Sequence, residues 1–147
     1  MGLTPLSGIM GQTRVGEIDA DVFSILNKNN LSVQKISELL SKKSGFFGLA
    51  KTKDTKKIIQ KAKEGNEKYK LVYEIYLNQI SAQIGEAFLL LQGCDLITLS
   101  GGVGFNNKYI LDDIYKKIKI LGIKKRQLKK VKSEEAKLIF EKIKNLN

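Results

Sequence analysis

"CDLITLSGGVGFNN" (94–107) carries the strongest indication of fold in this chain. It joins a short β-rich run, Leu96 to Leu99, to three glycines within four residues, and a helix-forming segment, "KYILDDIYKKIKIL" (108–121), follows. The order of strand, glycine turn and helix is typical of an α/β fold, in which a buried strand delivers a loop to its carboxyl end. Glycines let a ligand approach the backbone closely, and the amino terminus of a helix favours an anionic group such as phosphate.

The spacing of these glycines matches neither of two common phosphate-binding motifs. "GGVG" (101–104) lacks the third glycine of the dinucleotide fingerprint at its required offset, and the Gly-Lys-Ser/Thr of a P-loop does not follow. From the residues alone, a tight structural turn and a nucleotide site are both open interpretations.

A long periodic segment, 66–92, precedes the glycine turn. Its apolar residues recur at intervals of three and four, which predicts a core-facing helix. These residues are Tyr69, Val72, Tyr73, Tyr76, Ile80, Ile84, Ala87, Phe88 and Leu91.

Three shorter helices are predicted nearer the amino terminus, each preceded by a residue suited to cap it. They are 20–29 after Asp19, 33–43 after Ser32, and 55–65 after Asp54. The second has one apolar stripe, made of Val33, Ile36, Leu39 and Leu40. The apolar, glycine-punctuated "SGFFGLA" (44–50) is expected to be a loop that packs against the core.

Arg14 stands in a glycine-flanked segment, "MGQTRVGEID" (10–19). The chain has 26 basic residues, and only Arg14 and Arg126 among them are arginines. Arginine carries a planar fork of donors that can hold a carboxylate or phosphate through two bonds at once, which lysine cannot do. From these residues alone, an ordinary surface cation is the alternative.

The amino-acid composition favours some classes of protein and excludes others. A chain of 147 residues that is 42% hydrophobic and 28% charged suits one globular domain, and no run of 18 uncharged apolar residues predicts a membrane span. One cysteine suits a reducing compartment, so we expect a cytoplasmic protein. The lack of histidine excludes a histidine general base within this chain and makes a structural zinc site very hard to build.

The formal charge of +11 raises the question of nucleic-acid binding. Much of the excess lies in "KKIKILGIKKRQLKKVK" (116–132), where apolar residues interleave with lysines and no aromatic side chain could stack on a base. This pattern favours a solvated basic face over a nucleic-acid partner. A small basic nucleotide- or nucleic-acid-binding module that works through this segment is the alternative.

Four segments resemble those of the acetate kinase (acetokinase) family, in the same order along the chain. They are "MGLTPLSGIMGQTRVGEID" (1–19), "KKSGFFGLA" (42–50), "EGNEKYKLVYEIYLNQISAQIGEAF" (64–88) and "CDLITLSGGVGFNN" (94–107). The resemblance covers only the carboxyl-terminal third or so of an acetate kinase. It implies an incomplete α/β lobe of the actin and sugar-kinase (ribonuclease H-like) ATPase fold, with 1–147 as one partial domain and the amino-terminal lobe absent.

The resemblance also implies an activity. The parent reaction would transfer a phosphoryl group from ATP to acetate and give ADP and acetyl phosphate, with magnesium whose associated residues we expect outside this chain. Propionate and butyrate kinases are the nearest alternatives. This chain alone is expected to be inactive, and a homodimer that uses helix 66–92 is expected, since the resembling lobe supplies the dimer contact in the family.

Several residues fall on functional positions of the family. Arg14 falls on the arginine that stabilises the transferring phosphoryl group, and Pro5 on a residue lining the pocket for the acetate methyl group. Asp54 falls on the aspartate that contacts the nucleotide ribose, and its simpler interpretation is a helix cap. The remaining expected nucleotide contacts are Thr55, Lys56, Gly102, Val103, Gly104, Phe105 and Asn106.

The last segment, 133–147, has an ambiguous pattern. Ser133 and the two acidic residues after it favour a helix start, whereas Leu138, Phe140 and Lys142 could alternate along a strand. The family resemblance implies a strand at 137–143.

Overall fold

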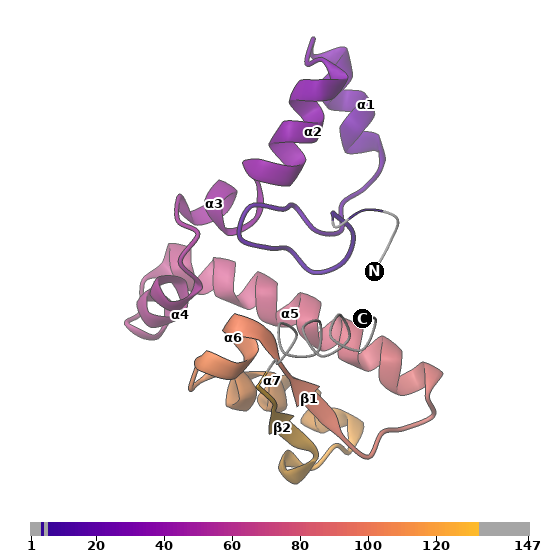
Figure 1. Ribbon diagram of the computed structural model, residues 1–147, viewed down its shortest axis with the longest axis vertical. Helices are drawn as coiled ribbons and strands as arrows, with labels where there is room; N and C mark the ends of the chain where they lie inside the picture. Colours follow the sequence, from indigo (N-terminus) through magenta and orange to yellow (C-terminus); the bar gives the residue numbers. More distant parts are fainter. Residues whose placement is uncertain (1–3, 5, 133–147) are drawn as a thin grey trace, which may run out of the picture. The chain divides into compact units, whose positions relative to one another are not determined.

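The structure is a computed structural model that describes residue 4 and residues 6–132 (Figure 1). The chain divides into two compact units, Met1–Ile84 and Gly85–Asn147. The prediction for 137–143 lies outside the described residues. No helix in the described ranges is both long and apolar enough to cross a lipid bilayer.

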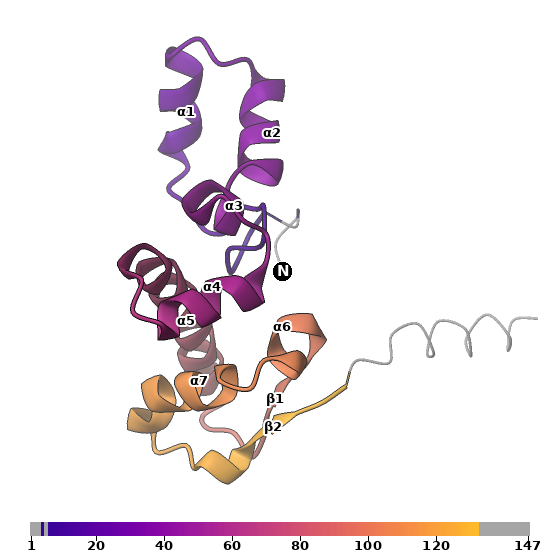
Figure 2. The ribbon, with the colours of Figure 1, turned by 90° about the vertical axis from the view of Figure 1, so that its left-hand side faces the viewer.

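The described part of the first unit is helical. Its elements are α1 (Asp21–Lys28), α2 (Val33–Lys42), α3 (Gly45–Ala50), α4 (Thr55–Lys63) and most of α5 (Glu67–Leu90). The four helices predicted at 20–29, 33–43, 55–65 and 66–92 are confirmed to within two residues at each end. Figure 2 shows α1 and α2 running antiparallel beside each other.

The caps of these helices agree in part with the prediction. Ser32 Oγ accepts the N–H of Lys35 at 3.4 Å, and Asp54 Oδ1 accepts the N–H groups of Lys56 and Lys57 at 2.9 and 3.1 Å. Asp19 was expected to be the N-cap of the first helix, but that position belongs to Ala20. The Asp19 carboxylate instead accepts the N–H of Asp21 at 2.8 Å, so it satisfies a free donor from one residue further back.

Two details of the first unit differ from the predictions. The stripe on α2 buries Ile36 but leaves Val33, the first residue of the helix, 55% exposed. The segment 44–50 was expected to be a loop, yet Gly45–Ala50 is helical, with Gly45, Phe46 and Ala50 buried. The prediction that it packs against the core is confirmed. The helix forms because that packing outweighs the low helix propensity of glycine.

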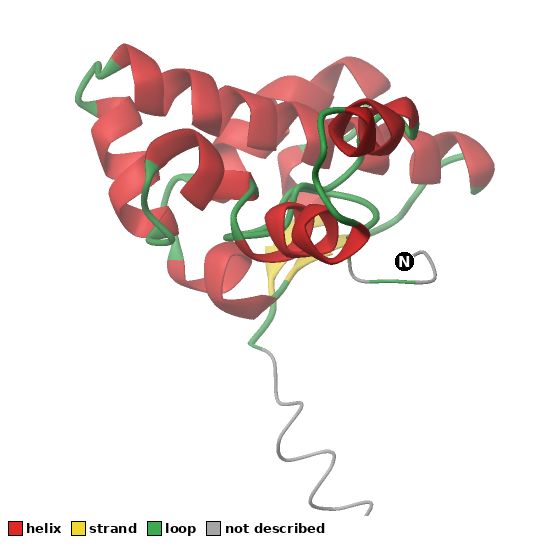
Figure 3. Ribbon diagram, turned by 90° about the horizontal axis from the view of Figure 1, so that it is seen from above, coloured by secondary structure: helices red, strands yellow, loops and turns green. Residues whose placement is uncertain are grey.

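The second unit contains the only strands of the described part of the chain, drawn in yellow in Figure 3. β1 (Ile97–Leu99) pairs in parallel with β2 (Leu128–Lys130), with Ile97 opposite Leu128 and Leu99 opposite Lys130. Between them lie α6 (Gly101–Asn106), α7 (Ile110–Ile118) and two 3₁₀ turns, η1 (Lys119–Leu121) and η2 (Lys125–Gln127). The buried apolar side chains of this unit come from α7, the turn after η1 and β2: Ile110, Ile114, Ile118, Ile123 and Leu128.

The prediction of an open glycine turn is wrong. Residues 101–106 form the short helix α6 instead of an open turn. A β-carbon at Gly104 would lie 3.3 Å from the Leu99 carbonyl carbon, so the missing side chain lets this helix pack directly on the end of β1. The order of strand, glycine-rich segment and helix is confirmed. The next helix begins at Ile110, two residues later than predicted, because Asn107 Oδ1 accepts the N–H groups of Tyr109 and Ile110.

Gly45 is the glycine on which the arginine loop depends. It has a φ of +59°, and a β-carbon there would stand 2.2 Å from the carbonyl oxygen of Gly11 and 2.6 Å from that of Arg14. The loop is held by backbone bonds from the same region: Ser44 N–H donates to Thr13, Phe46 N–H to Gly11, and Phe47 N–H to Gln12, at 2.9–3.0 Å.

We therefore expect Gly45→Ala to destabilise the first unit by about 3 kcal/mol or more, because it adds steric overlap to left-handed strain. Gly65→Ala is a matched control: Gly65 also has a positive φ of +88°, but no described atom lies within 4 Å of its would-be β-carbon. In the control, the free energy of unfolding should fall by only about 1 kcal/mol. Urea unfolding followed by circular dichroism measures the stability of both variants. Equal losses of stability would show that the close contact at Gly45 is unimportant.

Candidate functional site

The loop that carries Arg14 is anchored on three sides. Gly11 N–H donates to the Arg14 carbonyl at 3.0 Å and closes the loop on itself, while Val15 N–H donates to the Leu40 carbonyl at the end of α2 at 2.9 Å. Thr13 Oγ1 donates to the Ser41 carbonyl at 3.0 Å. The backbone on both sides of Arg14 is therefore fixed, although Arg14 itself is exposed.

The Arg14 side chain lies over Gly11. A β-carbon at Gly11 would stand 3.2 Å from the Arg14 Nε, which is closer than ordinary contact. Glycine at position 11 thus leaves room for the guanidinium group to lie beside the backbone. The planar fork is presented from a rigid base, which is the arrangement that favours a two-bond contact with an anion.

The loop also rests on the long helix of the first unit. Met10 is buried, and its N–H donates to Gln79 Oε1 of α5 at 3.0 Å. Phe46 packs edge-on against Tyr76 of the same helix, with ring centroids 5.1 Å apart. Burial raises the pKa of the Tyr76 hydroxyl above its usual value, so this support stays neutral at physiological pH.

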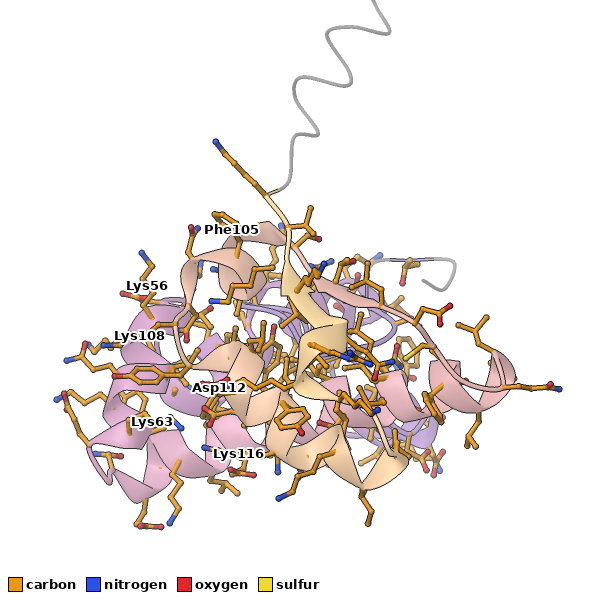
Figure 4. All side chains as sticks on the ribbon, turned by 90° about the horizontal axis from the view of Figure 1, so that it is seen from below. Lys56, Lys63, Phe105, Lys108, Asp112 and Lys116 are labelled. Atoms are coloured by element: carbon orange, nitrogen blue, oxygen red, sulfur yellow. The ribbon has the colours of Figure 1, made fainter. Side chains whose placement is uncertain are left out.

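The next group of predicted residues stands at the start of α4. Asp54 uses Oδ1 to cap the helix, and its own N–H donates to Thr52 Oγ1 at 3.2 Å. Thr55 is only 7% exposed, and its hydroxyl is buried without a hydrogen-bond partner among the described residues. Lys56 is exposed (Figure 4). The simpler interpretation of Asp54 as a cap is confirmed, and both cap bonds use Oδ1, not the second carboxylate oxygen.

The glycine-rich segment 100–107 lies at the carboxyl end of β1. Gly101 has a φ of +74° and Gly104 packs on Leu99, so the fold itself requires glycine at both positions. Gly102 is different: it is exposed, it has no positive φ, and no described atom lies within 4 Å of where its β-carbon would be. Within the described part of the chain nothing requires glycine at 102, while the open space leaves the backbone accessible to a ligand.

The other predicted residues of this segment differ in exposure. Val103 and Gly104 are half-buried, Asn106 is exposed, and Phe105 on α6 is 38% exposed (Figure 4). A half-exposed aromatic ring and an exposed amide beside accessible backbone could contact the base and hydroxyl groups of a nucleoside.

The predicted site residues thus fall into two groups. Arg14 and residues 54–56 belong to the first unit, and residues 102–106 belong to the second. Pro5 lies outside the described residues. Residues 54–56 adjoin one another at the start of α4 and residues 102–106 lie together on α6, whereas Arg14 stands apart in its own loop.

Two supporting residues were missed by the sequence analysis. Asn107 caps α7 through its side chain, and its carbonyl accepts a hydrogen bond from the Lys130 ammonium group of β2. This contact ties the end of the glycine-rich segment to the neighbouring strand. An asparagine three residues before a helix start was a usable signal for the cap. No sequence signal marked Lys130, 23 residues further along, because nothing distinguishes it from the other lysines of the basic segment.

The described residues offer no evident metal centre. Across residue 4 and residues 6–132, no three carboxylate, cysteine or histidine side chains gather closely enough to hold a cation.

Comparison with known proteins gives one family. The chain matches the Acetokinase family over residues 1–144. It is 38% identical over 138 residues to the acetate kinase of Thermotoga maritima, covering 92% of this chain and 34% of that protein. It is 37% identical over 123 residues to acetate kinase 2 of Vibrio cholerae, covering 83% of this chain and 31% of that protein.

Solved structures give the same result. A propionate kinase from Francisella tularensis superposes with a TM-score of 0.85 at 27% identity, over 92% of this chain and 40% of that one. An acetate kinase from Porphyromonas gingivalis superposes with a TM-score of 0.76 at 32% identity, over 84% of this chain and 31% of that one. The chain spans about one third of the length of the curated relatives it matches. By sequence and by fold, the chain belongs to the acetokinase family.

Proposed function

We propose that this chain is the carboxyl-terminal lobe of an acetate kinase. In the proposed reaction, a carboxylate oxygen of acetate attacks the terminal phosphorus of ATP. The new oxygen–phosphorus bond forms as the bond to the β-phosphate oxygen breaks, and acetyl phosphate and ADP result. Family membership supports this proposal, and the anchored arginine loop is the structural observation that carries it.

Arg14 is the residue to which we assign the stabilisation of the transferring group. A metaphosphate-like group spreads negative charge over its equatorial oxygens, and a guanidinium fork can bond two of these at once. The backbone bonds of Thr13 and Val15 and the close contact at Gly45 anchor the loop from which the fork extends before the substrate arrives. Preorganisation of this kind avoids reorganisation during the reaction.

The glycine-rich segment is the proposed adenosine site. Open space at Gly102 supports a ligand that approaches the backbone there, and Val103, Phe105 and Asn106 are placed to surround it. Asp54, at the start of α4, is the proposed ribose contact, with the carboxylate oxygen that does not cap the helix. Thr55 and Lys56 complete the proposed contacts, and Thr55 would act through its backbone because its hydroxyl is buried.

Pro5 is the proposed contact for the acetate methyl group. The acceptor could also be propionate, since one of the similar structures is that of a propionate kinase. Magnesium would accompany ATP, and we expect its protein contacts outside this chain. The chain alone should therefore not complete the reaction.

The test is to join the 147 residues to the amino-terminal two thirds of the Thermotoga maritima relative. The joined protein should form acetyl phosphate from ATP and acetate, whereas the chain alone should not. In the joined protein, Arg14→Lys keeps the charge but loses the fork, and turnover should fall on the order of 10³-fold. The Michaelis constant for ATP should change little, because the contact matures in the transition state. Near-normal turnover in the lysine variant would show that Arg14 is only a loop cation.

A second test addresses Gly102. In the same joined protein, Gly102→Ala should weaken ATP binding at least about tenfold, equivalent to about 1.4 kcal/mol, because a methyl group would enter the proposed adenosine site. Gly85→Ala is the matched control, since Gly85 is also helical with no described atom within 4 Å of its would-be β-carbon. Either alanine should raise stability by up to about 1 kcal/mol through helix propensity. Equal ATP affinity in both variants would remove the adenosine site from this segment.

The proposal includes a homodimer that uses α5. Leu89 and Leu90, at the end of that helix, are 74% and 78% exposed, and the adjacent Leu91 is 71% exposed. Three consecutive exposed leucines are unusual on a monomer surface and suit a second copy of the chain.

Light scattering on the 147-residue chain should therefore give the mass of a dimer. Leu90→Glu should give a monomer, because it puts a charge in the buried contact. Ile120→Glu is the control: Ile120 is 88% exposed in η1, so the charge should leave the dimer intact. A monomer before any substitution would contradict this assembly.

A further inference from the structure

A charged depression lies at the edge of the sheet opposite the glycine-rich segment. It has a volume of about 570 Å³ and is lined by Asp95, Leu96, Lys124, Arg126, Gln127 and Lys129. Asp95 and Leu96 immediately precede β1, and the other four lie just before β2 or, for Lys129, within it. Because the two strands are parallel, their amino ends meet at one edge, while the proposed adenosine segment follows the carboxyl end of β1. The depression is thus separate from that site.

The Gln127 side chain builds this depression. Its Nε2 donates to the Cys94 carbonyl at 2.7 Å, and its Oε1 accepts the N–H of Lys124 at 2.7 Å. One amide therefore ties the segment before β1 to the segment before β2. Arg126 lies between the two residues joined by this clamp, Lys124 and Gln127, so its backbone is fixed as well.

The charge of the depression is unbalanced. Lys124, Arg126 and Lys129 face one carboxylate, Asp95, and none of the four forms an ion pair with another described residue. Lys125 stands between Lys124 and Arg126 in the sequence, and its ammonium group is already paired with the Asp112 carboxylate at 2.7 Å. Within residues 6–132, two positive charges are left without a counterion in a concave surface, where the field of like charges adds up.

We propose that this depression binds a small polyphosphate. Arg126 would hold one phosphate through its fork, and Lys124 and Lys129 would act as point charges on the next. The volume falls within the range of small-ligand pockets, about 300–1,000 Å³. Arg126 is also one of only two arginines among 26 basic residues, and the other, Arg14, is the proposed phosphoryl contact.

Calorimetric titration of the 147-residue chain with inorganic tripolyphosphate tests this site. Arg126→Gln should weaken binding at least about tenfold, and Arg126→Lys should lose much of the affinity although the charge remains. Lys119→Gln removes the same charge from an exposed position outside the depression, so its affinity should stay within about twofold of the parent. Asp95→Asn should strengthen binding, because it removes the one opposing charge.

Three results would overturn the proposal. Equal losses in Arg126→Gln and Lys119→Gln would reduce the effect to overall charge. A loss in Arg14→Gln, with Arg126→Gln unaffected, would place the polyphosphate at the arginine loop instead. Binding of oligothymidylate without binding of tripolyphosphate would assign the basic surface to a phosphodiester chain.

Discussion

The carbonyl oxygens of Gly11 and Arg14 stand where a β-carbon of residue 45 would lie, and the arginine loop can dock only because that atom is missing. The bonds that complete the docking come from the backbone N–H groups of Ser44, Phe46 and Phe47. Backbone groups are the same for almost every residue type. The position of the loop therefore depends little on the side chain at 12, and strongly on the lack of one at 45, with the Thr13 hydroxyl as the one side-chain anchor named above.

The helices could be predicted because their signals are local. Ser32 and Asp54 cap the helices that they precede, and apolar spacing of three and four marked the 24-residue α5 to within two residues at each end. The order of β1, glycine-rich segment and α7 was also readable from 96–121. The family resemblance then supplied the proposed site residues, which the pattern of glycines alone did not.

What could not be predicted depends on contacts between distant residues. The helical state of 45–50 comes from burial of Phe46 against Tyr76, 30 residues away, and its two glycines pointed to a loop. The helix at 101–106 depends on how closely Gly104 can approach Leu99, which no window of sequence reports. The clamp made by Gln127 reaches back 33 residues to Cys94. Each case is one of tertiary packing overriding local preference.

Each strand of the two-stranded sheet has one outer edge that pairs with no other described strand. Within the described ranges, β1 and β2 pair only with each other over three residues each, extended by one bond from Val131 N–H to the Leu99 carbonyl. The N–H and C=O groups on the far side of each strand are therefore a template for another strand. Such a template recognises an extended backbone in general and discriminates little between sequences. A segment that joins the sheet there could change its residues freely in evolution while keeping the same attachment.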